Sequence, residues 1–372
     1  MERNTNPLFI LRFIAAIMVV FYHYSPTIVR SDLFFFVANG GEAVNFFFFL
    51  SGFVMIIANA RYFSDKNDYF SRSDFYIKRI ARIYPLYLFA ILALAAFHYG
   101  IKPIDTPSVK YRLFFEVLGL QRWLYAGSFN YPGWTISCEF FFYLLFPFAI
   151  VYLHRNPRKF KIFVIGYWVF SCIMTTVLFY LKNASLSHIE KVLIDSAYLN
   201  PVLLISVFLL GMLCGKMFIE NKSAFFKNQW NNRVCVLLGA TLIFSVKFFI
   251  PGDYGLLKAG VLAPVYFVFI TAVSSFKKSE TRVFNSSLFL FLGEISYGIY
   301  ILQYPVYTYF IHYIMPVSNG VSLLCFTGTL ILVASITFYT IEGPFKRLIL
   351  NYYNKNKDFV KVYPKQFSQK VN

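Results

Sequence analysis

Ten stretches of mainly apolar residues follow one another along the chain, and short segments that carry most of the charged side chains separate them. A helix needs about 20 apolar residues to cross a hydrocarbon core that is about 30 Å thick. The pattern therefore predicts an all-α integral membrane protein, a bundle of about ten transmembrane helices. The expected helices cover approximately residues 7–24, 41–60, 83–99, 133–153, 162–181, 199–215, 234–250, 256–276, 286–314 and 320–341.

The composition supports a membrane protein and argues against a soluble one. Hydrophobic residues make up 58% of the 372 residues, charged residues make up 14%, and the mean hydropathy is +0.58. Soluble domains carry about 25% charged residues. We find no internal repeat of the kind that many transporters show. We expect one transmembrane domain, residues 1–342, followed by a basic tail, residues 343–372.

The distribution of Lys and Arg predicts the orientation of the bundle. If the N-terminus is cytoplasmic, the cytoplasmic segments hold 25 of these residues and the outer segments hold 9. Because positive residues favour the cytoplasmic side, we expect both termini and the basic tail to be cytoplasmic. Much of the net charge of +18 then reflects topology. The basic residues form no recognisable nucleic-acid module, so we expect no nucleic-acid partner.

Two further features limit the chemistry. The first apolar run carries Arg12 and is followed by Ser25, Pro26 and Thr27 rather than by a cleavage site, so we expect a retained first helix. The cysteines have neither metal-ligand spacing nor a disulfide framework, so we expect packing residues and no metal. They are Cys138, Cys172, Cys214, Cys235 and Cys325.

Arg12 and His23 lie within the first expected span, where charge is costly and marks a functional site by default. Their separation of eleven residues corresponds to about 1100° of helix, three turns plus about 20°, and to a rise of about 16 Å. They therefore share one helix face, which would suit an elongated ligand in the bundle interior. Alternatively, Arg12 extends to the inner membrane interface and His23 extends to the outer one.

A second group of charges lies in the segment YIKRIARIYP, residues 76–85. Arg79 and Arg82 are three residues apart and lie on one helical side, with Lys78 adjacent. Guanidinium groups bind phosphate through two parallel hydrogen bonds, so the pair is suited to a phosphorylated cytosolic cofactor. In the alternative, the segment is a basic flank that contacts anionic lipid.

Glu139 enters the fourth expected span from the outer side, five residues after Trp134. His23 ends the first span on that same side, so we expect the two side chains at a similar depth. A carboxylate that accepts a hydrogen bond from an imidazole orients it for general base catalysis. In the alternative, Glu139 pairs with a Lys or Arg of another helix. Trp134 is typical of an interfacial belt, and we consider it a weak candidate for substrate binding.

These residues resemble a known family, the membrane-bound acyltransferase-3 proteins, and the matching motifs occur in order across nearly the whole chain. The family motifs are an arginine and a histidine with ten residues between them, a Phe-Phe-x-x-Ser-Gly-Phe signature, paired arginines, a Trp-Ser/Thr-x-x-x-Glu segment and two motifs near the end. They are met by Arg12 with His23, NFFFFLSGF (45–53), Arg79 with Arg82, WTISCEFFFYLLFP (134–147), ISYGIYILQYPV (295–306) and IEGPFKRL (341–348).

Two positions depart from the family pattern. Asn45 stands where an acidic residue is common, and Gln303 stands where a histidine is common, so we assign no acid–base role to either. Some members also carry a fused extracytoplasmic hydrolase-like domain, which this sequence does not show. We expect the protein either to complete the transfer itself or to pass its acyl group to an extracytoplasmic transferase partner.

The resemblance implies an acyltransferase of the bacterial plasma (inner) membrane, with acetyl-CoA as acyl donor. Arg79 and Arg82 would hold the donor phosphates, and Arg12 would stabilise charge on the donor. His23 would deprotonate an acceptor hydroxyl or accept the acyl group itself, and Glu139 would orient it.

The implied acceptor is a cell-surface polysaccharide or its lipid-linked precursor, such as O-antigen, lipopolysaccharide or capsule. A glycan or lipid-linked sugar transporter or flippase is the alternative from another class, and succinyl transfer is an alternative chemistry. The sequence does not define the oligomeric state.

Overall fold

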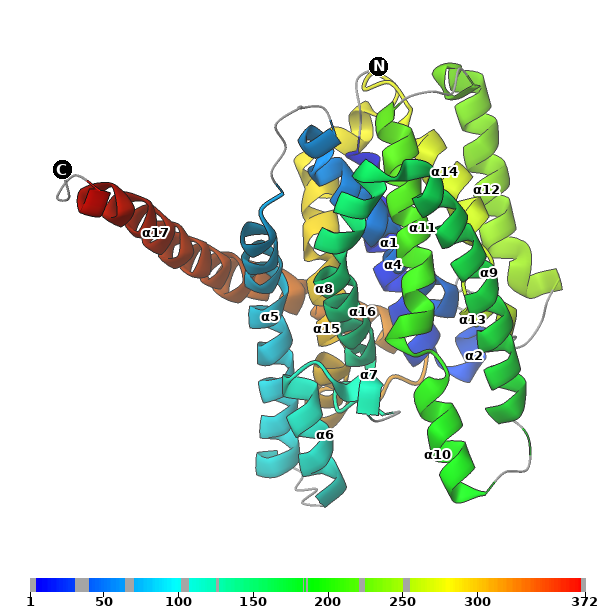
Figure 1. The fold of residues 1–372 in the computed structure, drawn as a ribbon. Coiled ribbons are helices and arrows are strands. Elements are labelled where there is room, and N and C mark those ends of the chain that lie inside the picture. The colour runs from blue at the N-terminus through cyan, green and yellow to red at the C-terminus, as the bar shows by residue number, and fades with distance from the viewer. Residues whose placement is uncertain are drawn as a thin grey trace.

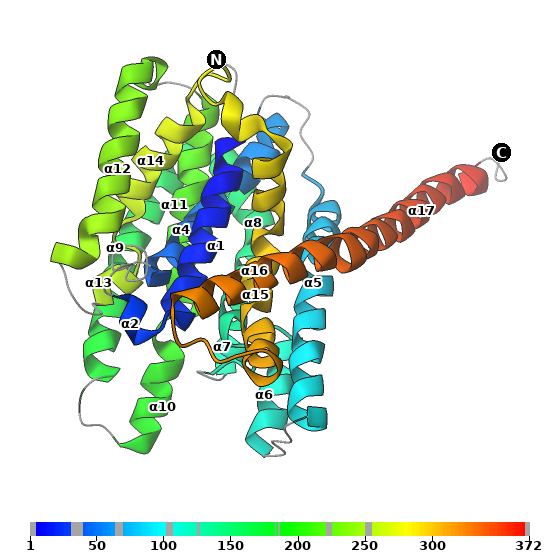
Figure 2. The same ribbon diagram turned by 180° about the vertical axis from the view of Figure 1, so that it is seen from behind.

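The computed structural model of this chain is built from helices, and its described part holds no strand (Figure 1). The structure describes residues 5–30, 40–63, 70–101, 107–124, 127–182, 184, 187–220, 225–249 and 255–368. Most of the long helices run side by side, and the first helix packs against the next long helix and against helices from the last third of the chain (Figure 2). The bundle therefore brings distant segments of the sequence together.

The helices follow the chain in this order: α1 (Pro7–Tyr24), α2 (Thr27–Arg30), α4 (Gly40–Ala58), α5 (Arg72–Ala96), α6 (Pro107–Val117), α7 (Gln121–Leu124), α8 (Trp134–Arg155), α9 (Pro157–Lys182), α10 (His188–Ala197), α11 (Pro201–Glu220), α12 (Gln229–Phe249), α13 (Gly255–Lys258), α14 (Ala263–Ser274), α15 (Ser287–Tyr313), α16 (Gly320–Thr337) and α17 (Gly343–Ser368). Short turns connect some of them: η1 (Ala60–Phe63), η2 (Phe97–Ile101), η3 (Tyr131–Gly133), η4 (Phe225–Lys227), η5 (Arg282–Asn285) and η6 (Phe338–Glu342).

The prediction of an all-α integral membrane protein agrees with this structure. Each of the ten predicted stretches contains a helix. In the described part of the chain, seven helical segments are long and apolar enough to cross a membrane. These are Pro7–Tyr24, Gly40–Ala58, Arg72–Gly100, Tyr131–Arg155, Pro157–Lys182, Glu190–Glu220 and Gly320–Asn356.

Two predicted boundaries were wrong, and each has a local cause. The third helix begins at Arg72 instead of residue 83, because Ser71 caps it by accepting a hydrogen bond from the Asp74 amide at 3.3 Å. The first turns of this helix carry charged residues, so hydropathy alone does not identify them as helical. The stretch 256–276 is divided into α13 and α14, with Gly260 between them at φ +81°, a conformation that favours glycine.

Helices α4 and α11 cross at very short range in the centre of the bundle. A Cβ atom at Gly52 would lie 2.1 Å from the backbone oxygen of Phe208, and one at Gly211 would lie 2.0 Å from that of Phe49. Such a crossing requires glycine, as is common between helices in membranes. This contact gives Gly52 of the NFFFFLSGF segment a structural role.

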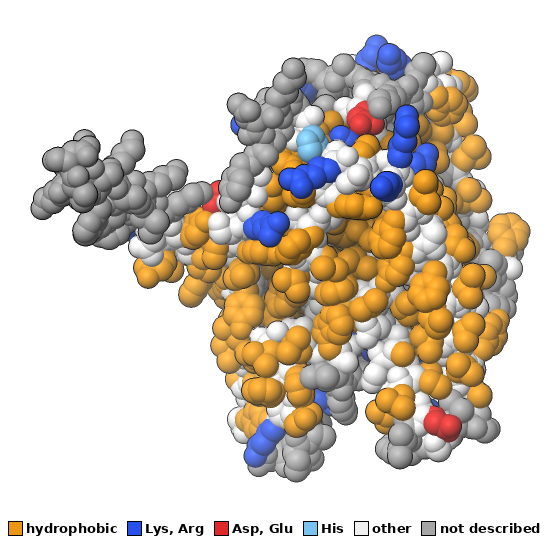
Figure 3. Space-filling view, in the orientation of Figure 1, with side chains coloured by type: hydrophobic (Ala, Val, Ile, Leu, Met, Phe, Trp, Pro, Cys, Tyr) orange, Lys and Arg blue, Asp and Glu red, His pale blue; other side chains and the backbone are white. Residues whose placement is uncertain are grey.

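Lys and Arg side chains gather in a band at the end of the bundle where the N-terminus lies, above a largely apolar surface (Figure 3). The predicted tail begins as helix α17, which extends away from the bundle in both ribbon views. Tyr353 of α17 donates a hydrogen bond to Asp74 of α5 at 2.7 Å. The first part of α17 is thereby attached to the helix that carries Arg79 and Arg82.

Candidate active site

Three arginines from two helices line one internal cavity of about 90 Å³. Arg12 comes from α1, while Arg79 and Arg82 come from α5. The predicted grouping of Arg79 with Arg82 therefore also includes Arg12, which was expected to share a helix face with His23. Lys78, which directly precedes Arg79, is exposed and is not among the described residues that line the cavity.

Glu139 of α8 lines the same cavity as the three arginines. The Tyr143 hydroxyl donates a hydrogen bond to its Oε2 atom at 2.5 Å, and Tyr143 also shares a hydrogen bond with Ser51 of α4. The carboxylate interacts electrostatically with Arg12 and Arg79. Ser51, the polar residue of the NFFFFLSGF segment, therefore belongs to this site.

The expected hydrogen bond between Glu139 and His23 was wrong. Glu139 is bonded to Tyr143, whereas His23 is bonded to Gln303. The alternative, in which Glu139 pairs with basic residues of other helices, describes its surroundings. The physical reason is that a carboxylate placed between helices is stabilised most by the nearest positive charges, and these come from α1 and α5.

Glu342 belongs to the IEGPFKRL segment, but no role was predicted for it. Its side chain is buried at the end of the η6 turn and interacts electrostatically with Arg82 and Arg12. With Glu139, two carboxylates face three guanidinium groups. The cluster therefore keeps a net positive charge that suits an anionic ligand such as a phosphate.

A second cavity of about 50 Å³ adjoins the first, and the two share Arg12, Phe47, Glu139 and Tyr297 in their walls. The second cavity is also lined by Thr135 of α8 and Ser296 and Tyr300 of α15, among others. The internal space therefore extends from the arginine cluster toward Tyr300. His23 is not among the described residues that line either cavity.

Gln303 connects this space to His23. Its Nε2 group donates a hydrogen bond to the backbone oxygen of Tyr300 at 2.7 Å, and its Oε1 atom lies 2.9 Å from Nδ1 of His23. Since the amide nitrogen is committed to a carbonyl, the amide oxygen must accept from His23, which places the imidazole proton on Nδ1. The Nε2 lone pair of His23 is left available as a base.

Three tyrosine rings surround the imidazole of His23. The Tyr131 ring meets it edge to face at 4.9 Å, and the rings of Tyr22 and Tyr24 lie at 5.4 Å and 5.9 Å between centroids. Tyr131 is 53% exposed, so the ring that packs on His23 lies at the surface of the protein. Lys258 adds a positive charge close to His23.

Trp134, the weak candidate for substrate binding, lies at the start of α8. It contacts Phe48 ring to ring at 6.4 Å, and the Arg122 guanidinium carbon lies 5.7 Å from its ring centre. It is not among the described lining residues of the two cavities. These contacts are those of a packing residue, and a direct contact between Trp134 and substrate stays a prediction.

The buried carboxylate of Glu116 on α6 fixes the loop that carries Tyr131. It accepts hydrogen bonds from the Ser128 hydroxyl at 2.6 Å, from the Phe129 amide at 2.8 Å and from the Asn130 amide at 3.4 Å. No sequence motif pointed to Glu116. Glu116 does not touch His23, but the loop that it holds places Tyr131 against the His23 ring.

Burial raises the pKa of Glu116 to about 7, against the hydrogen bonds that favour its ionised form. The folded protein therefore keeps a proton that the unfolded chain releases near pH 4.5. The free energy of unfolding should fall as the pH rises from about 4.5 to about 7, by up to about 1.4 kcal/mol per pH unit. Above about pH 7 this group should cause no further change. We expect Glu116→Gln to flatten this slope in thermal unfolding followed at several pH values. Parallel curves for the two proteins would contradict this assignment.

In the part of the chain that the structure describes, no group of three or more His, Cys, Asp or Glu side chains is arranged to hold a metal ion. The five cysteines are unpaired thiols, four of them buried.

Long apolar helices around an arginine-lined cavity define a multi-pass membrane protein with an internal charged site. The chain belongs to the acyltransferase-3 family: the family profile, described as an acyltransferase domain, matches residues 8–340. The resemblance seen in its motifs is thereby confirmed.

The relatives are named as acyltransferases or acetyltransferases. The chain is 34% identical to acyltransferase MdmB of Streptomyces mycarofaciens over 40% of each chain. It is 27% identical to putative acetyltransferase ORF330 of Acidianus two-tailed virus, over 81% of this chain and 83% of the relative. It is 24% identical to peptidoglycan O-acetyltransferase OatA of Listeria monocytogenes, over 94% of this chain and 57% of the relative.

The chain thus spans little more than half the length of OatA. No solved structure matches it.

Proposed function

We propose that this protein transfers an acetyl group from cytosolic acetyl-CoA to a hydroxyl of a cell-surface polysaccharide or of its lipid-linked precursor. The observation that carries the proposal is the internal path from the arginine cluster of Arg12, Arg79 and Arg82 toward Tyr300 and the Gln303–His23 pair. Family membership favours acyl transfer over transport of a sugar.

The proposal places the enzyme in a bacterial plasma membrane, with about ten transmembrane helices and both termini in the cytoplasm. The bias of Lys and Arg toward the predicted cytoplasmic segments supports this orientation. The band of basic side chains at one end of the bundle is consistent with it. The arginine cluster would then face the cytosolic donor, and His23 would face the outer acceptor.

The residues present fit a phosphorylated donor. Three guanidinium groups provide forked donors for phosphate oxygens, while Glu139 in the cavity wall and the buried Glu342 interact electrostatically with them. Tyr143 and Ser51 add hydroxyls to the same site. A donor bound there would present its acyl end to the second cavity.

In the proposed chemistry, His23 works through its Nε2 atom. Gln303 keeps the proton on Nδ1, so Nε2 can take the proton of an acceptor hydroxyl as that hydroxyl attacks the thioester carbon. The C–S bond then breaks, and the departing thiolate takes that proton from Nε2. Alternatively, Nε2 attacks the thioester itself, the thiol leaves, and the acyl-imidazole is then opened by the acceptor. The second route lets an outer acceptor react without meeting the cytosolic donor.

Transfer of label tests the proposed function. We expect purified protein in lipid nanodiscs to move radiolabel from acetyl-CoA to surface polysaccharide isolated from cells that lack the protein. Succinyl-CoA run in parallel decides which acyl group is used. Label that stays in the donor with every glycan offered, together with unchanged glycan acetate in the deletion strain, would reject acetyl transfer.

A further inference from the structure

A cleft of about 600 Å³, separate from the arginine cavity, opens at the end of the bundle where α8, α11 and α14 finish and α9 begins. Its walls are largely apolar, and two basic residues stand at its α9 side, Arg158 and Lys161. The apolar lining residues are Leu153, Leu213, Met217, Phe218, Phe226 and Phe267. A cleft with these walls combines a surface for hydrocarbon with a site for negative charge.

The charges of the cleft are positive on balance. Lys216 forms an ion pair with Glu220 at 3.4 Å, and its ammonium lies 3.9 Å from the centre of the Phe63 ring. Arg158 and Lys161 are exposed, three residues apart on one side of α9, and form no ion pair with a described residue. Their charges are therefore available to an anion.

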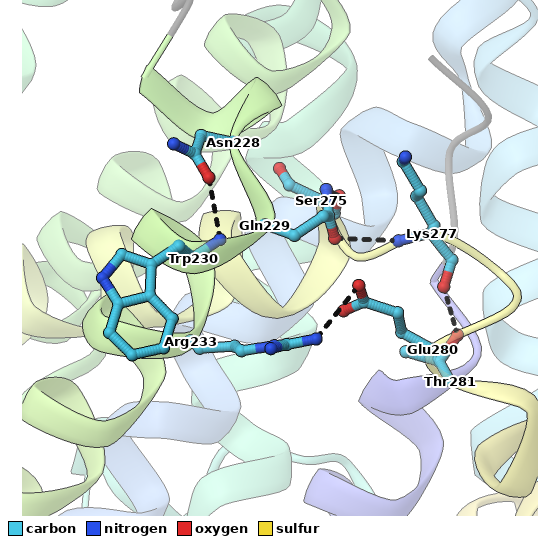
Figure 4. A network of polar contacts seen from close by, with 8 residues as sticks. All are labelled: Asn228, Gln229, Trp230, Arg233, Ser275, Lys277, Glu280 and Thr281. Carbon is cyan, nitrogen blue, oxygen red and sulfur yellow. Dashed lines mark hydrogen bonds and ion pairs between the residues drawn. The ribbon is translucent and has the colours of Figure 1, made fainter.

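One wall of the cleft is held in place by a network of polar contacts (Figure 4). Gln229 of α12 donates to the backbone oxygen of Ser275, a cleft residue, at 3.4 Å, and accepts from the Lys277 amide at 3.2 Å. Arg233 and Glu280 add an ion pair at 3.2 Å. These contacts join α12 to the end of α14 beside the cleft.

Helix α4 separates the cleft from the arginine cavity. Its residues Ser51 and Val54 line the cavity, while Phe53 packs against Phe218 of α11, which lines the cleft. The two spaces share no lining residue. The cleft is therefore not part of the proposed donor site.

Exposed apolar residues follow Arg158 and Lys161 along α9. Ile162 is 74% exposed and Ile165 41%, and in a membrane this surface faces lipid. A ligand that fills the cleft can therefore extend hydrocarbon along α9 without leaving an apolar environment. This continuity favours a membrane lipid over a soluble anion.

We propose that the cleft binds an anionic phospholipid, whose phosphate contacts Arg158 and Lys161 and whose acyl chain lies against Met217, Phe226 and the outer face of α9. Basic pockets between helices are suited to anionic headgroups. The proposal requires that the bundle is embedded in a membrane, and it is independent of the acyl donor and acceptor.

Retention of phosphatidylglycerol on the purified protein, measured by native mass spectrometry from mixed micelles, tests this site. We expect the double variant Arg158→Gln, Lys161→Gln to bind it about thirtyfold more weakly, since each of the two basic groups near a headgroup contributes about 1 kcal/mol. Lys159→Gln is the matched control, because Lys159 is exposed on the same turn but does not line the cleft. Arg158→Lys with Lys161→Arg should retain the lipid.

Three results would overturn the proposal. Equal loss in Lys159→Gln and in the double variant would show unspecific attraction to a basic surface. Full retention in the double variant would show that these residues do not bind the headgroup. Displacement of the lipid by coenzyme A or by inorganic phosphate alone would show a site for soluble anions. Thermal unfolding of each variant confirms that the fold is intact.

Discussion

His23→Ala should reduce acyl transfer by about 10²- to 10⁴-fold, the range that a positioned general base contributes. The reason is geometric: Gln303 accepts from Nδ1 at 2.9 Å and leaves Nε2 as the free nitrogen. Glycan acetate in cells and label transfer from acetyl-CoA in nanodiscs both measure the loss. Binding of the donor should be unchanged, because His23 is not among the described residues of the arginine cavity.

His312→Ala is the matched control for this experiment. His312 also lies in the last turn of a long helix, it is exposed, and its ring meets Phe97 and Tyr313. We expect near-parental activity.

Gln303→Leu should reduce acyl transfer by about tenfold or more and change its pH profile, because the imidazole tautomer is then no longer fixed. Parental glycan acetate in His23→Ala at normal membrane abundance would refute the role of His23.

Much of the fold could be predicted because the bilayer imposes its own length on the helices. The first helix begins at Pro7 and ends at Tyr24, as the apolar run does. The failures occur where a local contact overrides hydropathy. Ser71 starts α5 among charged residues, and Gly260 interrupts an otherwise apolar stretch.

The site was only partly visible in the sequence. Spacing within one helix placed Arg79 with Arg82, since residues three apart share a side. Pairings between helices depend on their crossing angles and rotations, which one sequence does not show. The carboxylate of Glu139 therefore lies among arginines, and the partner of His23 is Gln303, a residue that had been given no role.

Glu116 and Glu342 were missed for a similar reason. Glu116 acts on the amides of a loop, and backbone partners leave no residue pattern. Glu342 belongs to a segment that matched the family, but its place beside Arg82 follows from the η6 turn that joins α16 to α17. Both carboxylates are buried, which only the folded chain reveals.

Replacing Arg79 and Arg82 by Gln should weaken binding of the acyl donor by at least about a hundredfold, since a hydrogen bond to a charged group contributes about 1.5–3 kcal/mol. The two guanidinium groups share the cavity with Arg12, and Gln can supply neither the charge nor the forked geometry. Equilibrium binding of radiolabelled acetyl-CoA and the KM for the donor measure the loss. At saturating donor, kcat should fall less than kcat/KM, because His23 is intact.

Lys78→Gln is the control that separates specific binding from a basic membrane flank. Lys78 precedes Arg79 on the same helix and is exposed, outside the described lining of the cavity. If the segment served only as a flank that contacts anionic lipid, each of the three substitutions would act on membrane insertion and none on donor affinity. Donor affinity that is unchanged in the double arginine variant would therefore remove the phosphate-binding role. Equal weakening in Lys78→Gln would assign the effect to general charge. Parental affinity in Lys78→Gln, together with a large loss in the double variant, places the donor phosphates on α5.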